Sequence, residues 1–357
     1  MTKNRFTALM AALLCMLYWR WAAAEGQEDT RAFRYRYVSI DSALPTGFDF
    51  FAEPINIINN GNVYLNAWTC TESSCAPSIA SYRNGTATIL HQNAQSISVN
   101  NHGVIGGSVV LDPVLFIEQA ALFDRGTVTR IPRMQGEFTS QVIRITDSCI
   151  ALVRWFDASF EQEHYYLYQN GRVTLLDFGG RQAAFLDVNN KGIVAGSLSD
   201  EAGVERAFRL NPFSGQLTLL PPLPTEPMSR GQAINNASEV LGYSFVPGAL
   251  ERIGVWRGKY FLTYFVEGTP QFPTVSNRLL WNNAGLIIIT RTSSSDMYSY
   301  LVPRPGTRLN LADLADTLPR WTLISDINER GDIVGVGGSS YFNIENTFLL
   351  ERVRDGR

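Results

Sequence analysis

The sequence predicts an all-β fold, a seven-bladed β-propeller with four antiparallel strands in each blade. Three observations support this prediction. A strand–turn–strand phrase occurs seven times, a hairpin turn that contains Gly follows most copies, and a lone strand near the N-terminus matches a strand that the last copy lacks. The phrase is clearest at 188–196, where the sequence reads Val-Asn-Asn-Lys-Gly-Ile-Val-Ala-Gly.

The seven copies follow one another at a nearly constant step. At the second position of the phrase stand Asn59, Asn100, Thr146, Asn189, Asn235, Asn282 and Asn328. Successive positions are 41, 46, 43, 46, 47 and 46 residues apart, a step that suits one propeller blade and is too long for a leucine-rich repeat. Asn and Asp favour turns because their side chains bond to the backbone two residues on. We therefore expect a structural role for these asparagines.

The fifth position of the phrase requires a residue that tolerates a positive φ angle. It is Gly in four copies and Asn62 in the first, and Gly and Asn adopt positive φ at the lowest cost. Cys149 and Ser238 stand there in two other copies. Those two turns are expected to differ in shape or to be strained.

Each phrase is followed by two more strand signals. An aromatic run such as 165–168 comes first, then a turn such as Asn84-Gly85, and then an alternating strand such as 86–90. Asn-Gly between apolar runs is a strong hairpin signal. Each unit therefore contains four antiparallel strands, which we name a to d in chain order.

The fullest copy also carries a family resemblance. Its Asn-Asn-x-Gly-x-Val-x-Gly-Ser stretch is followed by Arg206-Ala207-Phe208, Gly215 and Leu219-Leu220. This pattern resembles the HAF-type extracellular repeat family, named for a His-Ala-Phe triplet, with Arg206 in place of His. Thr146, Val153 and Ile289 depart from the pattern in copies three and six. Over residues 55–353 the resemblance implies a secreted, β-propeller-like protein, and it brings no established activity and no site residues.

The start of the chain predicts export. Residues 1–24 have the pattern of a signal peptide: Lys3 and Arg5 precede an apolar stretch of 14 residues, and an Ala-Ala-Ala cleavage site ends at Ala24. The apolar stretch is short for a membrane span of about 20 residues, and an uncleaved anchor is the alternative. We expect a secreted or periplasmic protein that keeps no stable membrane span once the signal is removed.

The remaining chain is expected to form one domain with a closed ring. Residues 25–32 are a polar lead-in, 33–353 the propeller and 354–357 a tail. Residues 34–40 alternate with period two, which indicates a strand, yet they precede the first phrase, and the last copy ends after its third strand. We expect 34–40 to supply strand d of the seventh blade, because closure of this kind leaves no long exposed sheet edge.

Composition and cysteine use agree with export. The net charge is −3, which gives no indication of a basic face for nucleic acid. A monomer is expected. Cys70 and Cys75 are expected to form a small disulfide across a hairpin loop, since a metal site would need further ligands nearby. Cys149 is left over in an apolar run, where we expect a buried free thiol.

The two ends of the blades differ in their connections. The a–b and c–d turns are short and alike, whereas the b–c connections, such as 154–164, and the d–a connections, such as 221–232, are longer and dissimilar. In an antiparallel blade the b–c and d–a connections lie at the same end. Variable loops on a rigid scaffold are where proteins place binding sites. Any ligand or partner is therefore expected on this b–c/d–a face.

The b–c connections are rich in acidic residues and supply the candidate binding residues. These are Asp157, Glu161, Glu163, His164, Asp200, Glu205 and Arg252. One interpretation is ordinary solvated surface charge. The other is a site for a divalent cation such as calcium, or for a cationic ligand, although no Asp-x-Asp-x-Asp-Gly loop supports calcium. No cofactor is otherwise expected.

Catalytic motifs are missing from the sequence. It contains three histidines and no Gly-x-Ser-x-Gly elbow, P-loop or Gly-x-Gly-x-x-Gly unit. The favoured hypothesis is a non-catalytic propeller that binds a protein, a glycan or another envelope component. The alternative is a carbohydrate-active enzyme with carboxylates at the mouth of the central channel, which requires two carboxyl groups about 5–10 Å apart. A purely structural or adhesive surface protein is a third interpretation.

Overall fold

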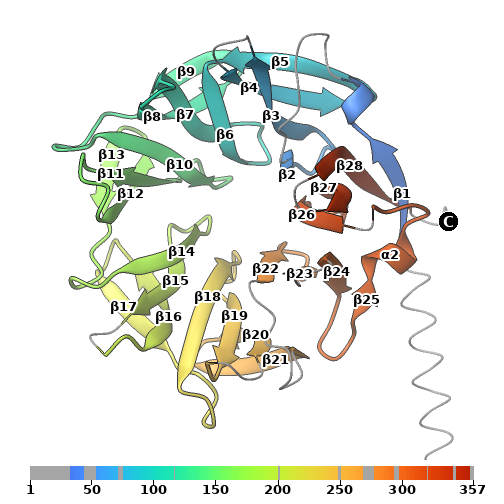
Figure 1. The fold of residues 1–357 in the computed structure, drawn as a ribbon. Coiled ribbons are helices and arrows are strands. Elements are labelled where there is room, and N and C mark those ends of the chain that lie inside the picture. The colour runs from blue at the N-terminus through green and yellow to red at the C-terminus, as the bar shows by residue number, and fades with distance from the viewer. Residues whose placement is uncertain are drawn as a thin grey trace, which may run out of the picture.

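The computed structural model describes residues 33–43, 54–70, 75–115, 117–199, 202–247, 251–267, 277–292, 297–319, 321–340 and 343–353. They form seven four-stranded antiparallel sheets, arranged as blades around a central axis with the first strand of each blade innermost (Figure 1). The predicted seven-bladed β-propeller is confirmed. No helix among the described residues has the length and apolar content needed to span a bilayer.

The first three blades follow the predicted order of strands. Blade 1 consists of β2 (Pro54–Ile57), β3 (Val63–Cys70), β4 (Cys75–Arg83) and β5 (Thr86–Gln92). Blade 2 consists of β6 (Ala94–Val99), β7 (Ile105–Asp112), β8 (Ile117–Asp124) and β9 (Thr127–Arg130). Blade 3 consists of β10 (Thr139–Ile145), β11 (Ala151–Phe156), β12 (Glu163–Gln169) and β13 (Arg172–Leu175).

The remaining blades complete the ring. Blade 4 consists of β14 (Ala183–Val188), β15 (Val194–Ser199), β16 (Glu205–Asn211) and β17 (Gln216–Leu220). Blade 5 consists of β18 (Met228–Ile234), β19 (Val240–Phe245), β20 (Glu251–Arg257) and β21 (Tyr260–Glu267). Blade 6 consists of β22 (Asn277–Trp281), β23 (Ile287–Thr292), β24 (Met297–Val302) and β25 (Leu309–Asn310), followed by the short helix α2 (Leu311–Leu314).

Blade 7 joins the two ends of the described chain. It consists of β26 (Trp321–Ile327), β27 (Ile333–Ser340), β28 (Asn343–Val353) and β1 (Arg34–Ser39), and a 3₁₀ turn, η1 (Asp41–Ala43), follows β1. Strand β1 pairs antiparallel with β28, so that Tyr35 lies opposite Arg352. Phe33 and Tyr35 also pack in a buried cluster with Phe348. The predicted ring closure is confirmed.

The hydrophobic core lies between neighbouring blades. One cluster joins Leu152 and Tyr165 of blade 3 to Val194 and Phe208 of blade 4. Another joins Val334 and Leu349 of blade 7 to strands of blade 1. Each sheet therefore buries its apolar side chains against the next sheet, as repeat units do when none of them can form a core alone.

The register proposed for the first copy of the phrase is wrong by one residue. The N–H of Ile58 donates to the carbonyl of Asn62, as that of Asn100 donates to Val104 in blade 2. Ile58, and not Asn59, therefore corresponds to Asn100, and Gly61, with φ of 88°, takes the place assigned to Asn62. The Asn-Asn pair at 59–60 suggested the wrong register, because Ile58 stands in this copy where Asn100 stands in the second.

Cys149 and Ser238 adopt the backbone conformation of the glycines that they replace. Their φ angles are 56° and 63°, so both turns keep the common shape at a conformational cost. Cys149 is thus a half-buried thiol in a turn, and the predicted burial in an apolar run is wrong. The c–d turns also behave as their sequences indicate, since Asn84 and Gly85 both have positive φ, as type I′ hairpins require.

The b–c loops are shorter than the sequence suggested. Strands β3 and β4 extend to Cys70 and Cys75, which lie opposite each other, and only 71–74 separate them. This register suits the predicted disulfide, which remains a prediction. Strands b and c continue beyond the apolar core with polar residues. Much of the sequence that was expected to be loop is therefore strand.

The last glycine of the repeat has a steric explanation. Most of the innermost strands contain a bulge. In blades 2, 4, 5 and 7 this glycine faces the bulge from strand b, whereas Leu65 and Val153 hold that position in blades 1 and 3. A Cβ atom on Gly107 would lie 1.9 Å from the carbonyl oxygen of Gln95, and one on Gly242 would lie 1.9 Å from that of Arg230. Gly196 and Gly335 have similar contacts, at 2.7 and 2.6 Å from a backbone oxygen. In these four blades the absence of a Cβ atom therefore makes room for the bulge.

Candidate functional site

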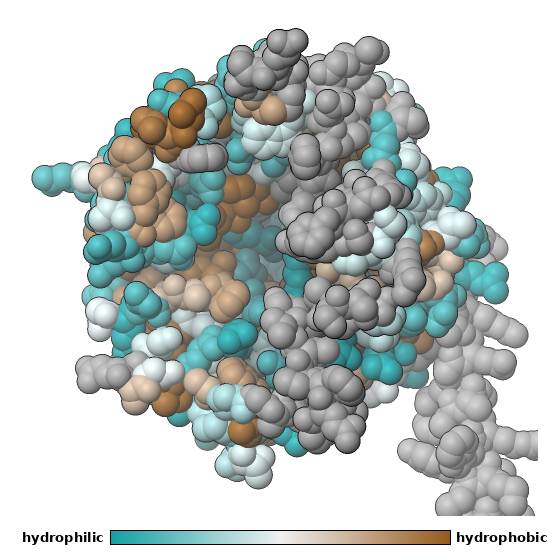
Figure 2. Space-filling model, viewed as in Figure 1, coloured by the Kyte–Doolittle hydropathy of each residue, from teal (hydrophilic) through white to brown (hydrophobic). Residues whose placement is uncertain are grey.

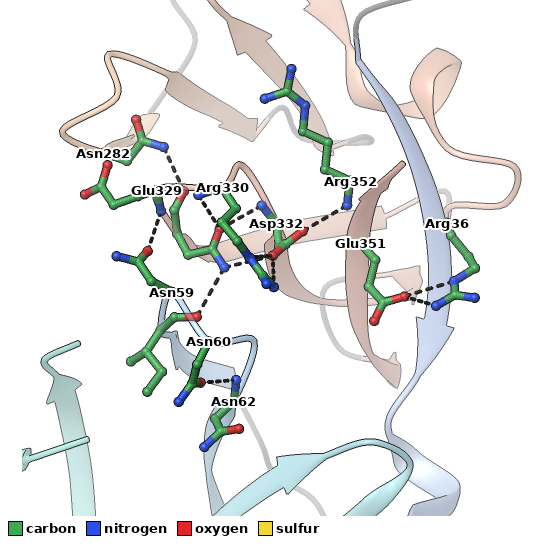
Figure 3. A network of polar contacts seen from close by, with 12 residues as sticks. Arg36, Asn59, Asn60, Asn62, Asn282, Glu329, Arg330, Asp332, Glu351 and Arg352 are labelled. Atoms are coloured by element: carbon green, nitrogen blue, oxygen red, sulfur yellow. Dashed lines mark hydrogen bonds and ion pairs between the residues drawn. The ribbon is translucent and has the colours of Figure 1, made fainter. Parts of the chain in front are cut away.

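The seven a–b turns are joined into one closed ring of hydrogen bonds around the channel. In each turn, a backbone N–H donates to the side-chain oxygen of the residue at the same position in the next blade. The members of this rim ring are Asn59, Asn101, Asp147, Asn190, Asn236, Asn283 and Glu329, and the seven N···O distances lie between 2.8 and 3.1 Å. Figure 3 shows the link from Glu329 to Asn59.

In five of the seven turns an asparagine precedes the rim residue, and most of these asparagines bond both to their own turn and to the next one. The Oδ1 atom of Asn189 accepts hydrogen bonds from the backbone N–H groups of Lys191 and Ile193. Its Nδ2 atom donates to the carbonyl of Asn235 and to the hydroxyl of Ser238, both at 3.0 Å, in the next blade. Asn100, Asn282 and Asn328 make the same kind of bond to the following blade. These side chains are structural, as expected.

A small polar cavity lies inside the rim ring. It has a volume of about 120 Å³ and is lined by turn residues together with Asn56, Arg144 and Asp326. Figure 2 shows that the ring is hollowed at its centre and that hydrophilic side chains lie within. The cavity has room for water molecules or a small ion.

The charged groups of the channel bind one another across blades. Arg144 of blade 3 forms a 3.0 Å ion pair with Asp187 of blade 4, and the attraction raises the pKa of Arg144. Asp187 also accepts a hydrogen bond from the backbone N–H of Ile234 in blade 5. These bonds place Asp187 as a link between three successive blades.

Asp326 has a similar role at the closing seam of the ring. Its Oδ2 atom accepts hydrogen bonds from the N–H of Ile57 and from Nδ2 of Asn56, at 2.9 and 3.0 Å. Burial raises the pKa of this carboxyl, and the two hydrogen bonds and the charge of Arg144 partly offset that effect. Both channel carboxylates thus serve as acceptors for the backbone of the next blade.

On the opposite face, four predicted site residues come together in blade 3. Asp157, Glu161, Glu163 and His164 lie in or beside the loop between β11 and β12. Hydrogen bonds from Ser159 lower the pKa of Asp157. Glu163 pairs with Arg154 at 3.4 Å.

Two aromatic contacts near this loop involve its predicted site residues. The phenol of Tyr165 donates to Glu163. His164 stacks on Trp155 with their ring centroids 4.2 Å apart. The loop therefore holds an acidic cluster with one tightly packed imidazole.

The remaining predicted site residues lie apart, in blades 4 and 5. Glu205 forms two 2.8 Å hydrogen bonds with Arg230, whose guanidinium also lies over the rings of Phe185 and Phe245. Arg252 pairs with the buried Glu226. These contacts join neighbouring elements and leave little freedom for a ligand.

Asp200, the last of the predicted site residues, lies outside the described residues. Within the part of the chain that the structure describes, no group of three His, Cys, Asp or Glu side chains is placed to hold a metal ion.

Sequence reasoning missed several exposed apolar groups on the b–c/d–a face. In the loop between β7 and β8, Val114 is 80% exposed and Leu115 59%. In the loop between β11 and β12, Phe160 is 49% exposed and has a φ angle of 57°, which is unusual for a bulky residue. For the first loop, the sequence did contain a signal of exposed apolar groups, namely the apolar pair that follows Asp112-Pro113 in a turn. Nothing in the sequence indicates the backbone strain at Phe160.

The fold is similar to that of several solved structures. The chain aligns with the β-propeller domain of the Trilobed protease from Pyrococcus furiosus, at 9% identity and a TM-score of 0.57, over 85% of this chain and 98% of that one. It also aligns with Pyrococcus horikoshii acylaminoacyl peptidase, at 10% identity and a TM-score of 0.60, over 89% of this chain and 54% of that one. A prolyl endopeptidase aligns at 10% identity and a TM-score of 0.54, over 93% of this chain and 54% of that one.

These likenesses concern the fold alone, because the identities are low. The chain spans about half the length of the two larger peptidases. The propeller domain of the Trilobed protease has an open velcro topology, whereas β1 pairs with β28 here. No family model and no curated protein matches the sequence.

Proposed function

We propose that the chain is an exported, non-catalytic β-propeller that binds a protein, a glycan or another envelope component through its b–c/d–a face. The b–c/d–a loops carry this proposal, because they expose apolar and acidic side chains together. On the a–b side, the side-chain oxygens of the rim ring already accept hydrogen bonds from backbone N–H groups of the preceding blade. On the b–c/d–a side, exposed apolar side chains such as Val114 and Phe160 stand among carboxylates. Exposed apolar groups of this kind favour contact with a partner.

The carbohydrate-active alternative has weaker support. Glycoside cleavage requires a pair of carboxyl groups that are free to exchange protons or attack the sugar. Asp187 and Asp326 of the channel are each held by a backbone N–H of the next blade. Their geometry fits a structural role better than a catalytic one.

Export is supported by the signal-like pattern of residues 1–24 and by the placement of Cys70 opposite Cys75. Disulfides persist in oxidising compartments and are rare in the cytosol. N-terminal sequencing of the protein recovered from the periplasm or medium of the producing cells tests this part of the proposal. A chain that begins near Glu25 is the expected result.

Site-specific photo-crosslinking tests the binding face. A photo-reactive phenylalanine analogue is placed at Ser159 on the b–c side, or at Lys191 or Asn84 on the a–b/c–d side, in the protein spanning residues 25–357. All three positions are exposed. Envelope material from the native host should crosslink to the first variant only, and a glycan array identifies carbohydrate partners. Crosslinks from Lys191 or Asn84 alone would place the partner on the wrong face and refute the proposal.

A further inference from the structure

We propose that the b–c/d–a loops of blades 2 and 3 bind a peptide segment that carries both apolar and basic side chains. This inference rests on the proposed function, and it specifies the surface and the chemistry of the partner. The surface, named here the blade 2–3 surface, consists of Leu111 near the end of β7, Val114 and Leu115 in the loop that follows, and Phe138, Phe156 and Phe160 around the loop between β11 and β12.

The loop between β7 and β8 presents its apolar side chains in a fixed shape. The Oδ1 atom of Asp112 accepts hydrogen bonds from the backbone N–H groups of Val114 and Leu115, at 2.9 and 3.0 Å. This closes an Asx turn. Val114 and Leu115 are consequently held outward in water, and Leu111 at the end of β7 is also exposed. Burial of these side chains by a partner would be favourable.

Phe160 presents an aromatic ring on a strained backbone. Its ring centroid lies 5.5 Å from that of Phe138 and 5.8 Å from that of Phe156, and the side chain remains half exposed. A positive φ is costly for a bulky residue, and such strain often occurs where a side chain contacts a ligand. The three rings together form a platform that is suited to apolar side chains of a partner.

The two loops belong to one connected surface. The backbone N–H of Glu118, at the start of β8, donates to the hydroxyl of Thr139 at 3.0 Å. Thr139 follows Phe138, whose N–H donates to the carbonyl of Phe156 at 2.8 Å. In Figure 2 an apolar area lies over the part of the ring where Figure 1 labels β8.

The charges of this surface favour a basic partner. Asp112, Asp157, Glu161 and Glu163 contribute four carboxylates, whereas Arg133 and Arg154 contribute two guanidinium groups, and Arg154 is paired with Glu163. The pKa of Asp157 is lowered, so this carboxyl stays ionised at neutral pH. Complementary charge speeds association and selects against acidic peptides.

Peptide binding measured by fluorescence anisotropy tests the proposal. The probe is a fluorescein-labelled peptide of about twelve residues composed of Leu and Lys, long enough to span roughly 40 Å when extended. Its control replaces every Lys by Glu. The Lys peptide should bind the protein at least about tenfold more tightly than the Glu peptide, and added salt should reduce this difference because it screens exposed charges.

Variants locate the binding surface. Val114→Ser and Phe160→Ser should each weaken binding of the Lys peptide by about fivefold or more, since they remove the exposed apolar contacts. Glu161→Lys, which leaves the apolar groups intact, should weaken it and reduce its salt dependence. Phe213→Ser is the matched control: Phe213 is 61% exposed but lies in a c–d turn on the opposite face, so binding should not change.

Three results would each overturn the proposal. They are failure of the Lys peptide to bind at about 1 mM, equally tight binding of the Glu peptide, and an effect of Phe213→Ser equal to that of Phe160→Ser. Photo-crosslinks from Ser159 to envelope material would then leave the proposed binding face intact and remove only this partner chemistry.

Discussion

The backbone N–H of Glu329 donates a hydrogen bond of 2.9 Å to Oδ1 of Asn59, a residue 270 positions earlier in the chain. This bond closes the rim ring between the last blade and the first (Figure 3). On the outer side of blade 7, β1 and β28 join the same two regions of the chain by strand pairing. The ring is thus closed twice, once at its centre and once at its edge.

Removal of β1 should open the ring. Deletion of residues 25–40 takes away Phe33 and Tyr35 from their buried cluster and leaves β28 as an unpaired edge strand. We expect the melting temperature to fall by at least about 5 °C, with aggregation visible by size-exclusion chromatography. Deletion of residues 25–32 alone is the control. If both deletions leave stability unchanged, the outer closure is not important.

A second prediction concerns the buried asparagines of the turns. Asn189 is 3% exposed and makes four hydrogen bonds, two of them to the next blade. Asn189→Ala should lower the free energy of unfolding by roughly 2–4 kcal/mol, because buried partners lose their bonds. Lys191→Ala, in the same turn and exposed, should change it little. Urea unfolding measures both, and equal effects would contradict the structural role.

The sequence alone allowed the propeller to be predicted because its turn chemistry is local. The Asx turn at Asn189 and the positive φ at Gly192 depend on residues only a few positions apart. The same local evidence misplaced the first copy, where Asn59 and Asn60 suggested a register that the backbone bonds of Ile58 exclude. Counting strands at the two ends sufficed to predict closure.

The candidate site was less predictable because its contacts join different blades. Arg144 meets Asp187 only once two sheets stand side by side. The repeat contained a weak signal: Arg144 and Asp187 both stand two positions before the second residue of the repeated phrase, which is Thr146 in one copy and Asn189 in the other. The exposure of Val114 depends on how the loop leaves the sheet. The periodic pattern of apolar residues, from which the strands were predicted, gives no information about the shape of such a loop.

A third prediction tests the steric role of the repeat glycine. A Cβ atom on Gly242 would lie 1.9 Å from the carbonyl oxygen of Arg230, so Gly242→Ala forces the bulge of β18 to move. We expect a loss of at least about 2 kcal/mol in unfolding free energy. Gly126→Ala is the comparison, since it introduces only positive-φ strain with nothing within 4 Å, at about 1 kcal/mol. A larger loss at Gly126 would contradict the steric explanation.

A fourth prediction concerns the cysteines of the exported protein. Cys70 and Cys75 lie opposite each other across β3 and β4, and Cys149 is free. The protein spanning residues 25–357, unfolded without reductant, should take up one iodoacetamide group per chain at Cys149. After reduction it should take up three. Mass spectrometry counts the groups, and three additions before reduction would show that the predicted disulfide is absent.

The last prediction follows from the raised pKa of Asp326. Burial makes the folded protein bind the proton of this carboxyl more tightly than the unfolded chain does. The contribution of Asp326 to the free energy of unfolding therefore decreases as the pH rises from about 3.9, the ordinary Asp value, through the folded-state pKa. Asp326→Asn is neutral throughout. Its stability relative to the wild type should thus increase over this pH range and then become constant.

Asp157→Asn provides the control of opposite sign. Hydrogen bonds from Ser159 lower the pKa of Asp157, so the folded state favours the ionised form. The extra unfolding free energy of the wild type over this variant is therefore fully present above the ordinary Asp pKa. It is lost as the pH falls through the folded-state pKa. Urea unfolding between pH 3 and pH 8, a range of about five units around these titrations, measures both variants. Parallel pH profiles would mean that burial of Asp326 does not control its titration, since the two carboxyls are shifted in opposite directions by opposite causes.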